Sequence, residues 1–234
     1  MIALRPRLEA AASMLAGADC IADIGCDHGR LGIALLQRGL CKRVIASDVS
    51  GDSLQKAMQL SQKCGMDGRL LFRLGEGLKV LKPGEADAIA IAGMGGSLIT
   101  DILIRDELVA RAANRIVMQP MRGEEQLRYY LNNNGYRIMD ETLIRDAGRF
   151  YQLLCASSGE PERKPAGWPD KLYKVGWVTY EKEDPLLSAY IKKLLAGNKR
   201  RLETAPDSAG YLREQTVCLE ELLTLIEEGE YETS

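Results

Sequence analysis

The stretch CIADIGCDHGRLGIALLQRG, residues 20–39, decides the fold. Its first part is a continuous apolar run that ends in a glycine turn at Gly25, which is typical of a buried strand. The second part, 31–39, has apolar residues at helical spacing and closes at Gly39, a common helix stop. A strand, a glycine turn and a helix in this order predict an α/β fold whose turn binds a ligand.

The alternation of strand and helix continues along the chain. Further strands are predicted at 43–49, 69–75, 87–93 and 115–120, and helices at 5–17, 52–64, 97–108 and 124–135. Two adjacent strands, 136–148 and 149–159, follow without a helix between them. The pattern predicts an α/β fold with a mostly parallel sheet of seven strands and helices on both faces.

The character of the sequence changes after Gly159. Residues 160–170, EPERKPAGWPD, are polar and proline-rich and are interpreted as a connector. Residues 184–203 and 208–230, with PDSAG between them, predict a helical hairpin that resembles a coiled coil. Its apolar positions are Leu187, Ile191, Leu194 and Leu202, then Leu212, Leu219, Leu222 and Ile226, with Gln215 at one seam position. We therefore expect a sheet domain at 1–160 and a connector with hairpin at 161–234.

The composition is that of a globular protein and argues against several classes. Hydrophobic residues make up 46% and charged residues 27%, and no run approaches the ~20 apolar residues of a membrane span. The N-terminal residues carry charges and lack a signal-peptide layout, so a cytoplasmic location is expected. The six cysteines form no CxxC pair and there is one histidine, so we expect reduced thiols and no metal site. A net charge of −2 neither indicates nor excludes a nucleic-acid partner, because a local basic patch is enough.

The turn after the first strand departs from the dinucleotide-binding fingerprint. That fingerprint, G-x-G-x-x-G, would need glycines where the chain has Asp27 and Arg30. A carboxylate there would repel a pyrophosphate by about 1 kcal/mol or more, which disfavours NAD and FAD. S-adenosylmethionine has no phosphate, and its methionine end carries an ammonium and a sulfonium. Asp23 or Asp27 would neutralise that ammonium, so the acid suits a cationic ligand.

Acids also follow the next two strands. Asp48 ends the second strand, where a carboxylate accepts hydrogen bonds from ribose hydroxyls, and Glu76 follows the third, within reach of an adenine rim. The alternative is that Asp23 and Asp48 only cap the helices that follow them. His28 likewise has two readings, as a contact to the cofactor or methyl acceptor and as a loop histidine bonded to backbone.

Six motifs, taken together, resemble the bacterial TrmK family. They are D-I-G-C-D-H-G at 23–29, A-S-D-V at 46–49, G-E-G-L at 75–78, I-A-G-M-G-G at 91–96, Q-P at 119–120 and D-A-G-R-F-Y-Q at 146–152. Their order and spacing match over about residues 1–160. The resemblance implies a class I, Rossmann-like methyltransferase that transfers a methyl group from S-adenosylmethionine to N1 of adenine 22 in tRNA.

The resemblance also implies the site residues. Asp23, Gly25, Asp27, His28 and Gly29 would line the methionine end of the cofactor, Asp48 and Val49 would hold the ribose, Glu76 and Gly77 would border the adenine, and Gly93, Met94, Gly95 and Gly96 would lie under the transferring methyl. Asp27 and the carbonyls of the Gly93–Gly96 loop are the candidates for accommodating positive charge on the acceptor. The expected substrate-binding residues are Arg5, Arg7, Arg30, Gln119, Pro120, Arg122, Arg149 and Tyr151.

Three departures from the family pattern stand out. Arg30-Leu31-Gly32 occupies the place of an aromatic residue and a proline, and Met121 replaces the asparagine that usually follows Q-P. The segment Gly51-Asp52-Ser53-Leu54 stands where the family often reads G-P-L. The first two lie near the expected acceptor pocket, so they bear on substrate choice more than on the cofactor.

The charged hairpin suggests how an RNA would be held. Its first helix carries Lys192, Lys193, Lys199, Arg200 and Arg201, whereas its second helix is acidic. We interpret it as an arm that grips tRNA; ion pairing on a solvated face and dimerisation are alternatives, and a monomer is favoured. Other functions weighed are a methyltransferase on a small molecule or protein, a non-catalytic module that binds S-adenosylmethionine, and a nicotinamide oxidoreductase.

Overall fold

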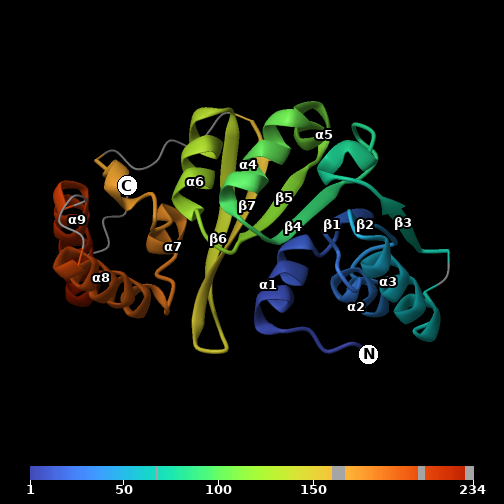
Figure 1. Cartoon of the computed structure of the whole chain (residues 1–234), viewed down its shortest axis with the longest axis horizontal. Coiled ribbons are helices and arrows are strands. Elements are labelled where there is room, and N and C mark those ends of the chain that lie inside the picture. The colour runs from blue at the N-terminus through green and yellow to red at the C-terminus, as the bar shows by residue number, and fades with distance from the viewer. Residues whose placement is uncertain (67, 160–166, 205–208, 230–234) are drawn as a thin grey trace.

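A seven-stranded sheet forms the centre of the computed structural model, which describes residues 1–66, 68–159, 167–204 and 209–229 (Figure 1). The strands are β1 Cys20–Ile24, β2 Arg43–Asp48, β3 Leu70–Leu74, β4 Ala88–Met94, β5 Arg115–Pro120, β6 Tyr136–Asp146 and β7 Arg149–Ser158. Their order across the sheet is β3-β2-β1-β4-β5-β7-β6. The pairs among β1 to β5 are parallel, and β7 is antiparallel to both β5 and β6. The predicted fold class, including the terminal hairpin of strands, is confirmed.

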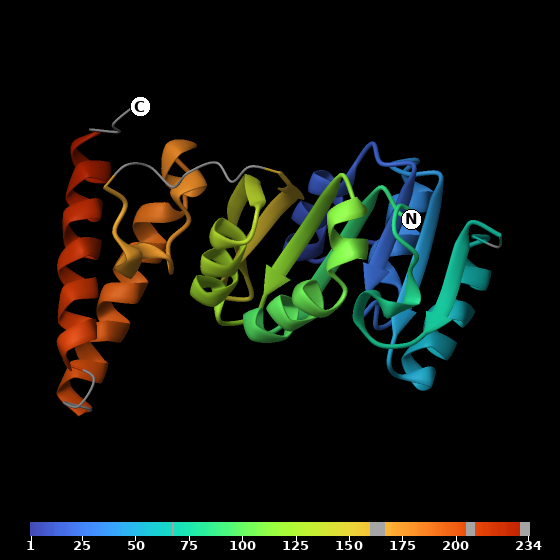
Figure 2. The ribbon, with the colours of Figure 1, turned by 90° about the horizontal axis from the view of Figure 1, so that it is seen from above.

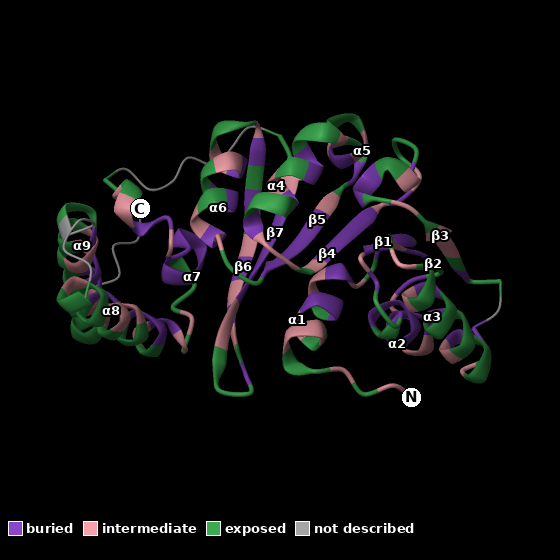
Figure 3. Ribbon diagram, viewed as in Figure 1, coloured by how far each residue is buried: buried purple, intermediate pink, exposed green. Residues whose placement is uncertain are grey.

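Helices cover both faces of this sheet. They are α1 Pro6–Leu15, α2 Arg30–Gln37, α3 Gly51–Lys63, α4 Gly96–Arg105, α5 Glu107–Ala112 and α6 Glu124–Asn133. Because successive strand residues point to opposite faces, each strand supplies two buried clusters. In β1, Ala22 and Ile24 pack in one cluster with residues of α4, α5 and α6, whereas Ile21 packs in the other with α1, α2 and α3. Strands β1, β2, β4 and β5 are accordingly buried along most of their length, whereas the edge strands β3 and β6 are partly exposed (Figure 3).

The strand order reverses between β1 and β4. The loops that leave the carboxyl ends of these two strands therefore diverge to opposite sides and open a crevice between them. The glycine turn at 25–29 and the glycine loop at 93–96 both lie at this edge. The topology thus places the two most unusual sequence motifs together.

One helical prediction needs correction. The helix predicted at 97–108 is two helices, which break at Asp106. The Asp106 carboxylate accepts a hydrogen bond from the backbone N–H of Leu78 at 3.2 Å, in the unpredicted 3₁₀ turn η1, Gly77–Val80. This tertiary contact holds Asp106 in a non-helical conformation, with φ −111° and ψ 37°.

The C-terminal region is helical and packs on the sheet domain. It contains η2 Asp170–Leu172, α7 Trp177–Glu181, α8 Leu187–Thr204 and α9 Ala209–Glu228. Helices α8 and α9 lie side by side as a hairpin, as predicted (Figure 2). Leu187, Ile191, Leu212, Leu219 and Leu222 are buried in its seam. At the polar seam position, the Asn198 amide donates to Gln215 Oε1 at 3.1 Å.

The predicted connector at 160–170 is only partly a connector. Residues 160–166, like 206–208 of PDSAG, lie outside the described residues. Trp168 is buried, and with Leu172 and Trp177 it belongs to the same apolar cluster as Ile24 of β1. The buried core is therefore shared between the sheet and the C-terminal region. None of the helices in the described ranges has the length and apolar content of a membrane crossing.

Candidate functional site

A cavity of about 280 Å³ opens at the carboxyl ends of β1, β4 and β5. Its lining residues are Arg7, Leu8, Asp23, Gly25, Cys26, Asp27, His28, Arg30, Leu31, Ala92, Gly93 and Gln119. The cavity lies at the point where the strand order reverses, which is where open α/β sheets bind ligands. It brings together most residues expected at the methionine end of the cofactor, with three of the expected substrate-binding residues.

Asp23 is a buried acid with an unused oxygen. Its side chain lines the cavity, and Asp23 is 4% exposed. The backbone N–H of Gly32 donates to the carboxylate, but Oδ2 has no hydrogen-bond partner among the described residues. Burial, helped by the nearby Asp48 charge, raises the pKa of Asp23 to about 7. A cationic ligand at this oxygen would relieve the unfavourable burial, so the site fits the ammonium of S-adenosylmethionine.

The glycine turn is held by the neighbouring strand β2. The backbone N–H groups of Gly25 and Cys26 both donate to the carbonyl of Ser47, at 2.8 and 2.9 Å. The next N–H, from Asp27, donates to Asp48 Oδ2 at 3.0 Å. Asp27 adopts a left-handed conformation with φ 50°, which is uncommon for a residue with a side chain. The Asp48 carboxylate therefore stabilises the bend that shapes the cavity.

The capping alternative for the two acids holds only in part. Asp23 does accept an N–H from the first turn of α2, whose N-cap is Gly29. Helix α3 is capped by Ser50, whose hydroxyl accepts the Ser53 N–H at 3.2 Å. Asp48 instead bonds the Ser50 N–H at 2.9 Å and the glycine turn.

Asp27 and His28 lie at the mouth of the cavity. His28 Nδ1 is 3.4 Å from Asp27 Oδ2, and the two side chains are 45% and 73% exposed. Their exposure leaves both groups accessible to a bound ligand. His28 contacts this carboxylate and lines the cavity, so its contact with a cofactor or methyl acceptor stays a prediction.

The residues expected at the ribose and adenine lie along the same edge, beyond the cavity. Val49 follows Asp48 and is 70% exposed, which leaves its side chain accessible at the expected ribose site. Glu76 is paired with Arg105 at 2.7 Å and with Lys79 at 3.2 Å, and the hydrogen bond from Arg105 lowers the pKa of Glu76. The Arg105 guanidinium also packs against Gly77. Glu76 would have to share its carboxylate with these cations to contact an adenine.

The glycine loop after β4 is packed against the loop after β5. A Cβ atom on Gly96 would lie 2.1 Å from the carbonyl oxygen of Gly123, so no larger residue fits. The Gly96 N–H donates to the Arg122 carbonyl at 2.7 Å, and the Met121 N–H donates to the Met94 carbonyl at 2.8 Å. Gly95 is the N-cap of α4. These hydrogen bonds and the close packing fix the backbone of the glycine loop below the cavity.

The expected substrate-binding residues fall into three groups. Arg7, Arg30 and Gln119 line the cavity, and the Arg7 guanidinium lies 5.5 Å from the ring centre of Tyr151. Arg5 is paired with Asp146 at 3.1 Å, close to Arg149 at the β6–β7 turn. Arg30 of the first group also donates a hydrogen bond to the carbonyl of Ala3 at 2.9 Å. Pro120 is buried, whereas Arg122 and Arg149 are exposed. The N-terminal residues thus cover one side of the site.

Two residues that line the cavity were not predicted from the sequence. Leu8 and Cys26 contribute to the cavity; helix α1 carries no sequence signal that places it over a ligand. Burial raises the pKa of the Cys26 thiol, which therefore stays neutral. All six cysteines are free, and the described residues contain no cluster suited to a metal ion.

The chain is similar in sequence to methyltransferases. A family described as a methyltransferase domain matches residues 4–154. A Bacillus subtilis protein named tRNA (adenine(22)-N(1))-methyltransferase is 32% identical over 157 residues, which is 67% of this chain and 66% of that protein. A relative from Mycoplasma genitalium is 31% identical over 134 residues, or 59% of its own length. The matches thus span about two thirds, or less, of these curated relatives.

Two solved structures match nearly the whole chain. The B. subtilis m1A22 tRNA methyltransferase TrmK has a TM-score of 0.79 and 26% identity, and the match covers 98% of this chain and 100% of that chain. A Streptococcus pneumoniae protein solved in complex with S-adenosyl-L-methionine has a TM-score of 0.84 and 28% identity, with 95% and 100% covered. The similarity therefore extends through the C-terminal helices.

Proposed function

The chain belongs to the methyltransferase-domain family and, within it, to the TrmK family, and on this premise we propose that it methylates N1 of adenine 22 in tRNA with S-adenosylmethionine. The observation that carries the proposal is the buried Asp23, with an unpaired oxygen, at the reversal of the strand order. A phosphate ligand would be repelled there, whereas a cationic amino-acid end is attracted.

The residues of the chain would divide the binding of the cofactor. S-adenosylmethionine supplies the methyl group from a sulfonium. Asp23 would hold its ammonium, and Asp48, whose oxygens keep spare lone pairs, would accept the ribose hydroxyls. Val49 would pack beside the ribose, and Glu76 with Gly77 would border the adenine. These roles follow the order of the strands β1, β2 and β3 across the sheet.

The chemistry needs alignment more than acid–base catalysis. N1 of adenine has a free lone pair at neutral pH, so no general base has to prepare it for attack. The backbone of Gly93–Gly96, fixed by its contacts with the β5 loop, would hold the acceptor nitrogen in line with the methyl carbon and sulfur. The exposed Asp27 carboxylate and the loop carbonyls would stabilise positive charge arriving on the base.

The acceptor base must reach the site unpaired, because N1 lies on the pairing edge of adenine. Tyr151 with Arg7 above it offers a surface on which such a base could stack. The exposed Arg122 and Arg149, and the cationic face of α8, would hold the phosphates. We propose a monomer acting in the cytoplasm.

The first experiment is a methylation assay. The purified protein is incubated with isotope-labelled S-adenosylmethionine and unmodified tRNA transcripts, and the digested nucleosides are analysed by mass spectrometry. Labelled 1-methyladenosine that disappears when adenine 22 is changed supports the proposal. Cofactor binding without any labelled nucleoside would contradict it and favour another acceptor or a non-catalytic module.

A further inference from the structure

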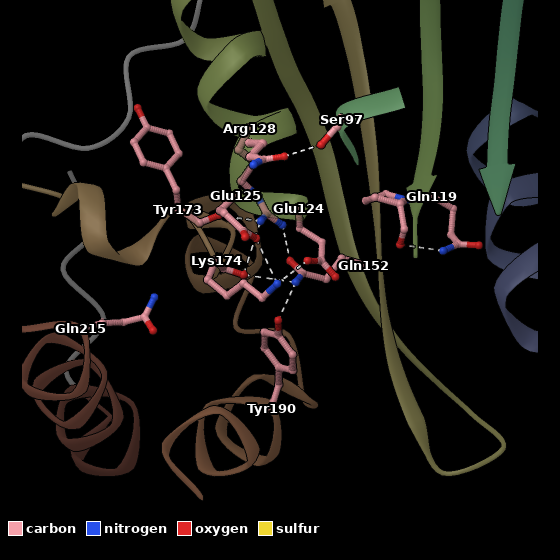
Figure 4. Close-up of polar contacts among 12 residues, drawn as sticks. Ser97, Gln119, Glu124, Glu125, Arg128, Gln152, Tyr173, Lys174, Tyr190 and Gln215 are labelled. Carbon is pink, nitrogen blue, oxygen red and sulfur yellow. Dashed lines mark hydrogen bonds and ion pairs between the residues drawn. The ribbon is translucent and has the colours of Figure 1, made fainter. Parts of the chain in front are cut away.

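Gln119 carries an unpaired acceptor in the cavity. The residue is 1% exposed, and its Oε1 has no hydrogen-bond partner among the described residues. Its Nε2 donates to the Pro120 carbonyl at 2.8 Å (Figure 4). The same nitrogen donates to the Met121 sulfur at 3.6 Å. A buried amide oxygen without a donor is unfavourable by about 1–3 kcal/mol, so this site awaits a donor from a ligand.

The orientation of the Gln119 amide follows from its neighbours. A carbonyl oxygen and a thioether sulfur can only accept hydrogen bonds. If the amide were turned over, its oxygen would face two acceptors, and the donor group would lose both partners. The nitrogen is therefore fixed toward Pro120 and Met121, and the oxygen is the atom left for the cavity.

The sheet order separates Gln119 from the cofactor acids. Asp23 is on β1, whereas Gln119 is at the end of β5, on the other side of β4. In the β4–β5 pairing, Gln119 is the partner of Ala92, the residue directly before Gly93. Gln119 thus lies beyond the glycine loop, on the side where the acceptor must enter.

We propose that Gln119 Oε1 accepts a hydrogen bond from the 6-amino group of the target adenine and so selects adenine over guanine. This inference rests on the proposed function. The 6-amino group is next to N1, and a single acceptor that binds it also sets the direction of the N1 lone pair. Guanine presents a carbonyl oxygen at the same place, which would oppose Oε1 and leave two acceptors unsatisfied.

The test is a double-mutant cycle that combines a change in the Gln119 side chain with removal of the 6-amino group of the target base. Wild type and Gln119→Leu are each assayed on two tRNAs, one with adenine at position 22 and one with purine, which keeps N1 but lacks the amino group. Single-turnover kcat/KM is measured for all four pairs. Purine is intrinsically less nucleophilic than adenine, so both proteins should be slower on it. The informative quantity is therefore the adenine-to-purine ratio of kcat/KM in wild type divided by the same ratio in Gln119→Leu.

We expect the wild type to prefer adenine over purine at least tenfold more strongly than Gln119→Leu does. Gln62→Leu, a matched change on the exposed face of α3, should keep the wild-type preference. Melting temperatures and the Kd for S-adenosylhomocysteine are measured for each variant. If Gln119→Leu does not fold, Gln119→Met serves instead, since its unbranched side chain has a similar length, lacks the amide oxygen and should likewise lose the preference.

Three results would overturn the inference. The first is an equal preference for adenine in wild type and Gln119→Leu. The second is a wild-type preference for adenine in Gln119→Met. The third is a Gln119→Leu variant that binds cofactor more weakly with its base preference unchanged, since Oε1 would then face the cofactor. A wild type that methylates neither tRNA would instead contradict the proposed function itself, so the two failures are distinguishable.

Discussion

At Asp23, a feature that suits a binding site lowers the stability of the folded protein. In the unfolded chain its pKa is near the ordinary value of 3.8, and in the folded protein burial raises it to about 7. The folded state therefore binds the Asp23 proton more tightly than the unfolded state does. The stability that this proton contributes is present below pH 4 and is lost as the pH rises toward 7.

Asp23→Asn should remove this pH dependence. Between pH 5 and pH 8 we expect the free energy of unfolding of the variant to gain roughly 2–3 kcal/mol on that of wild type, at 1.36 kcal/mol per pKa unit. Urea unfolding of both proteins without cofactor, at both pH values, measures the difference. Parallel pH profiles would mean that Asp23 is ionised in the folded protein.

Gly96 is limited by space rather than by conformation. Gly96→Ala would drive a Cβ atom into the Gly123 carbonyl, and neither backbone can move without displacing its loop. We expect a loss of at least about 2 kcal/mol in stability and most of the methylation activity. Gly51→Ala is the control, because nothing lies within 4 Å of its added Cβ. Equal melting temperatures for the two variants would contradict the argument.

At the scale of elements, Asp48 couples the ends of β1 and β2. Asp48→Ala removes the acceptor of the Asp27 N–H and, by our proposal, of the ribose hydroxyls. We expect the Kd for S-adenosylhomocysteine to rise at least tenfold by calorimetry, and less in Asp48→Asn, which keeps one acceptor oxygen. Asp52→Ala, an exposed acid in the next helix, should bind as wild type does. An unchanged Kd in Asp48→Ala would exclude the proposed contact with the ribose.

Most helices and strands could be predicted because their local sequence pattern agrees with the structure they adopt. The buried strands are apolar runs bounded by turn residues, and the helices around them have a clear apolar face. The break at Asp106 could not be predicted, since it depends on the Leu78 N–H, which is distant in sequence. Trp168 was missed because it lies in a polar, proline-rich stretch and is buried only by tertiary packing. Helix α7 was missed because five residues are too few to show a helical period.

The site was predictable as a set of residues but not as a set of contacts. The acids at the strand ends were visible in the sequence, because parallel strands bring their carboxyl ends to one edge. That Asp48 bonds the turn containing Asp27, and that Glu76 is shared with Arg105, depends on side-chain geometry. The covering of the cavity by Arg7 depends on how α1 packs, which no local pattern encodes.

At the scale of the whole molecule, a buried polar network joins the sheet to the C-terminal region. Arg128 of α6 is fully buried, with Nε 2.6 Å from Glu141 Oε1 and Nη1 2.9 Å from the Tyr173 carbonyl. Its other nitrogen, Nη2, donates to Gln152, whose amide donates to the Tyr190 hydroxyl at 2.7 Å (Figure 4). One guanidinium thus links α6, both strands of the β6–β7 hairpin and the segment before α7.

Replacing either member of the buried Arg128–Glu141 ion pair should destabilise the protein strongly. Arg128→Met leaves Glu141 buried without a cation, and Glu141→Leu leaves Arg128 without its anion; each should lose about 3–5 kcal/mol. The double variant should lose clearly less than the sum of the two. Chemical denaturation of the four proteins gives the coupling. Additive losses would mean that the pair acts as two independent groups.

The hairpin charges are accessible for a role in binding. Lys192 is paired with Glu227 at 2.7 Å, whereas Lys199, Arg200 and Arg201 are exposed and form no ion pair with a described residue. Reversal of these three charges to glutamate should weaken tRNA binding about tenfold and lower its dependence on salt, with cofactor affinity unchanged. Filter binding at several salt concentrations tests this. An unchanged tRNA affinity would remove the hairpin from the RNA-binding surface.

The position of β7 also governs when the protein can fold during synthesis. This strand is the last made, yet it lies inside the sheet, between β5 and β6. Until residues 149–158 leave the ribosome, β5 has an open edge, and an unpaired strand edge recruits other chains. We therefore expect a nascent chain stalled before β7 to be a chaperone client, and the sheet to close only once most of the protein has emerged.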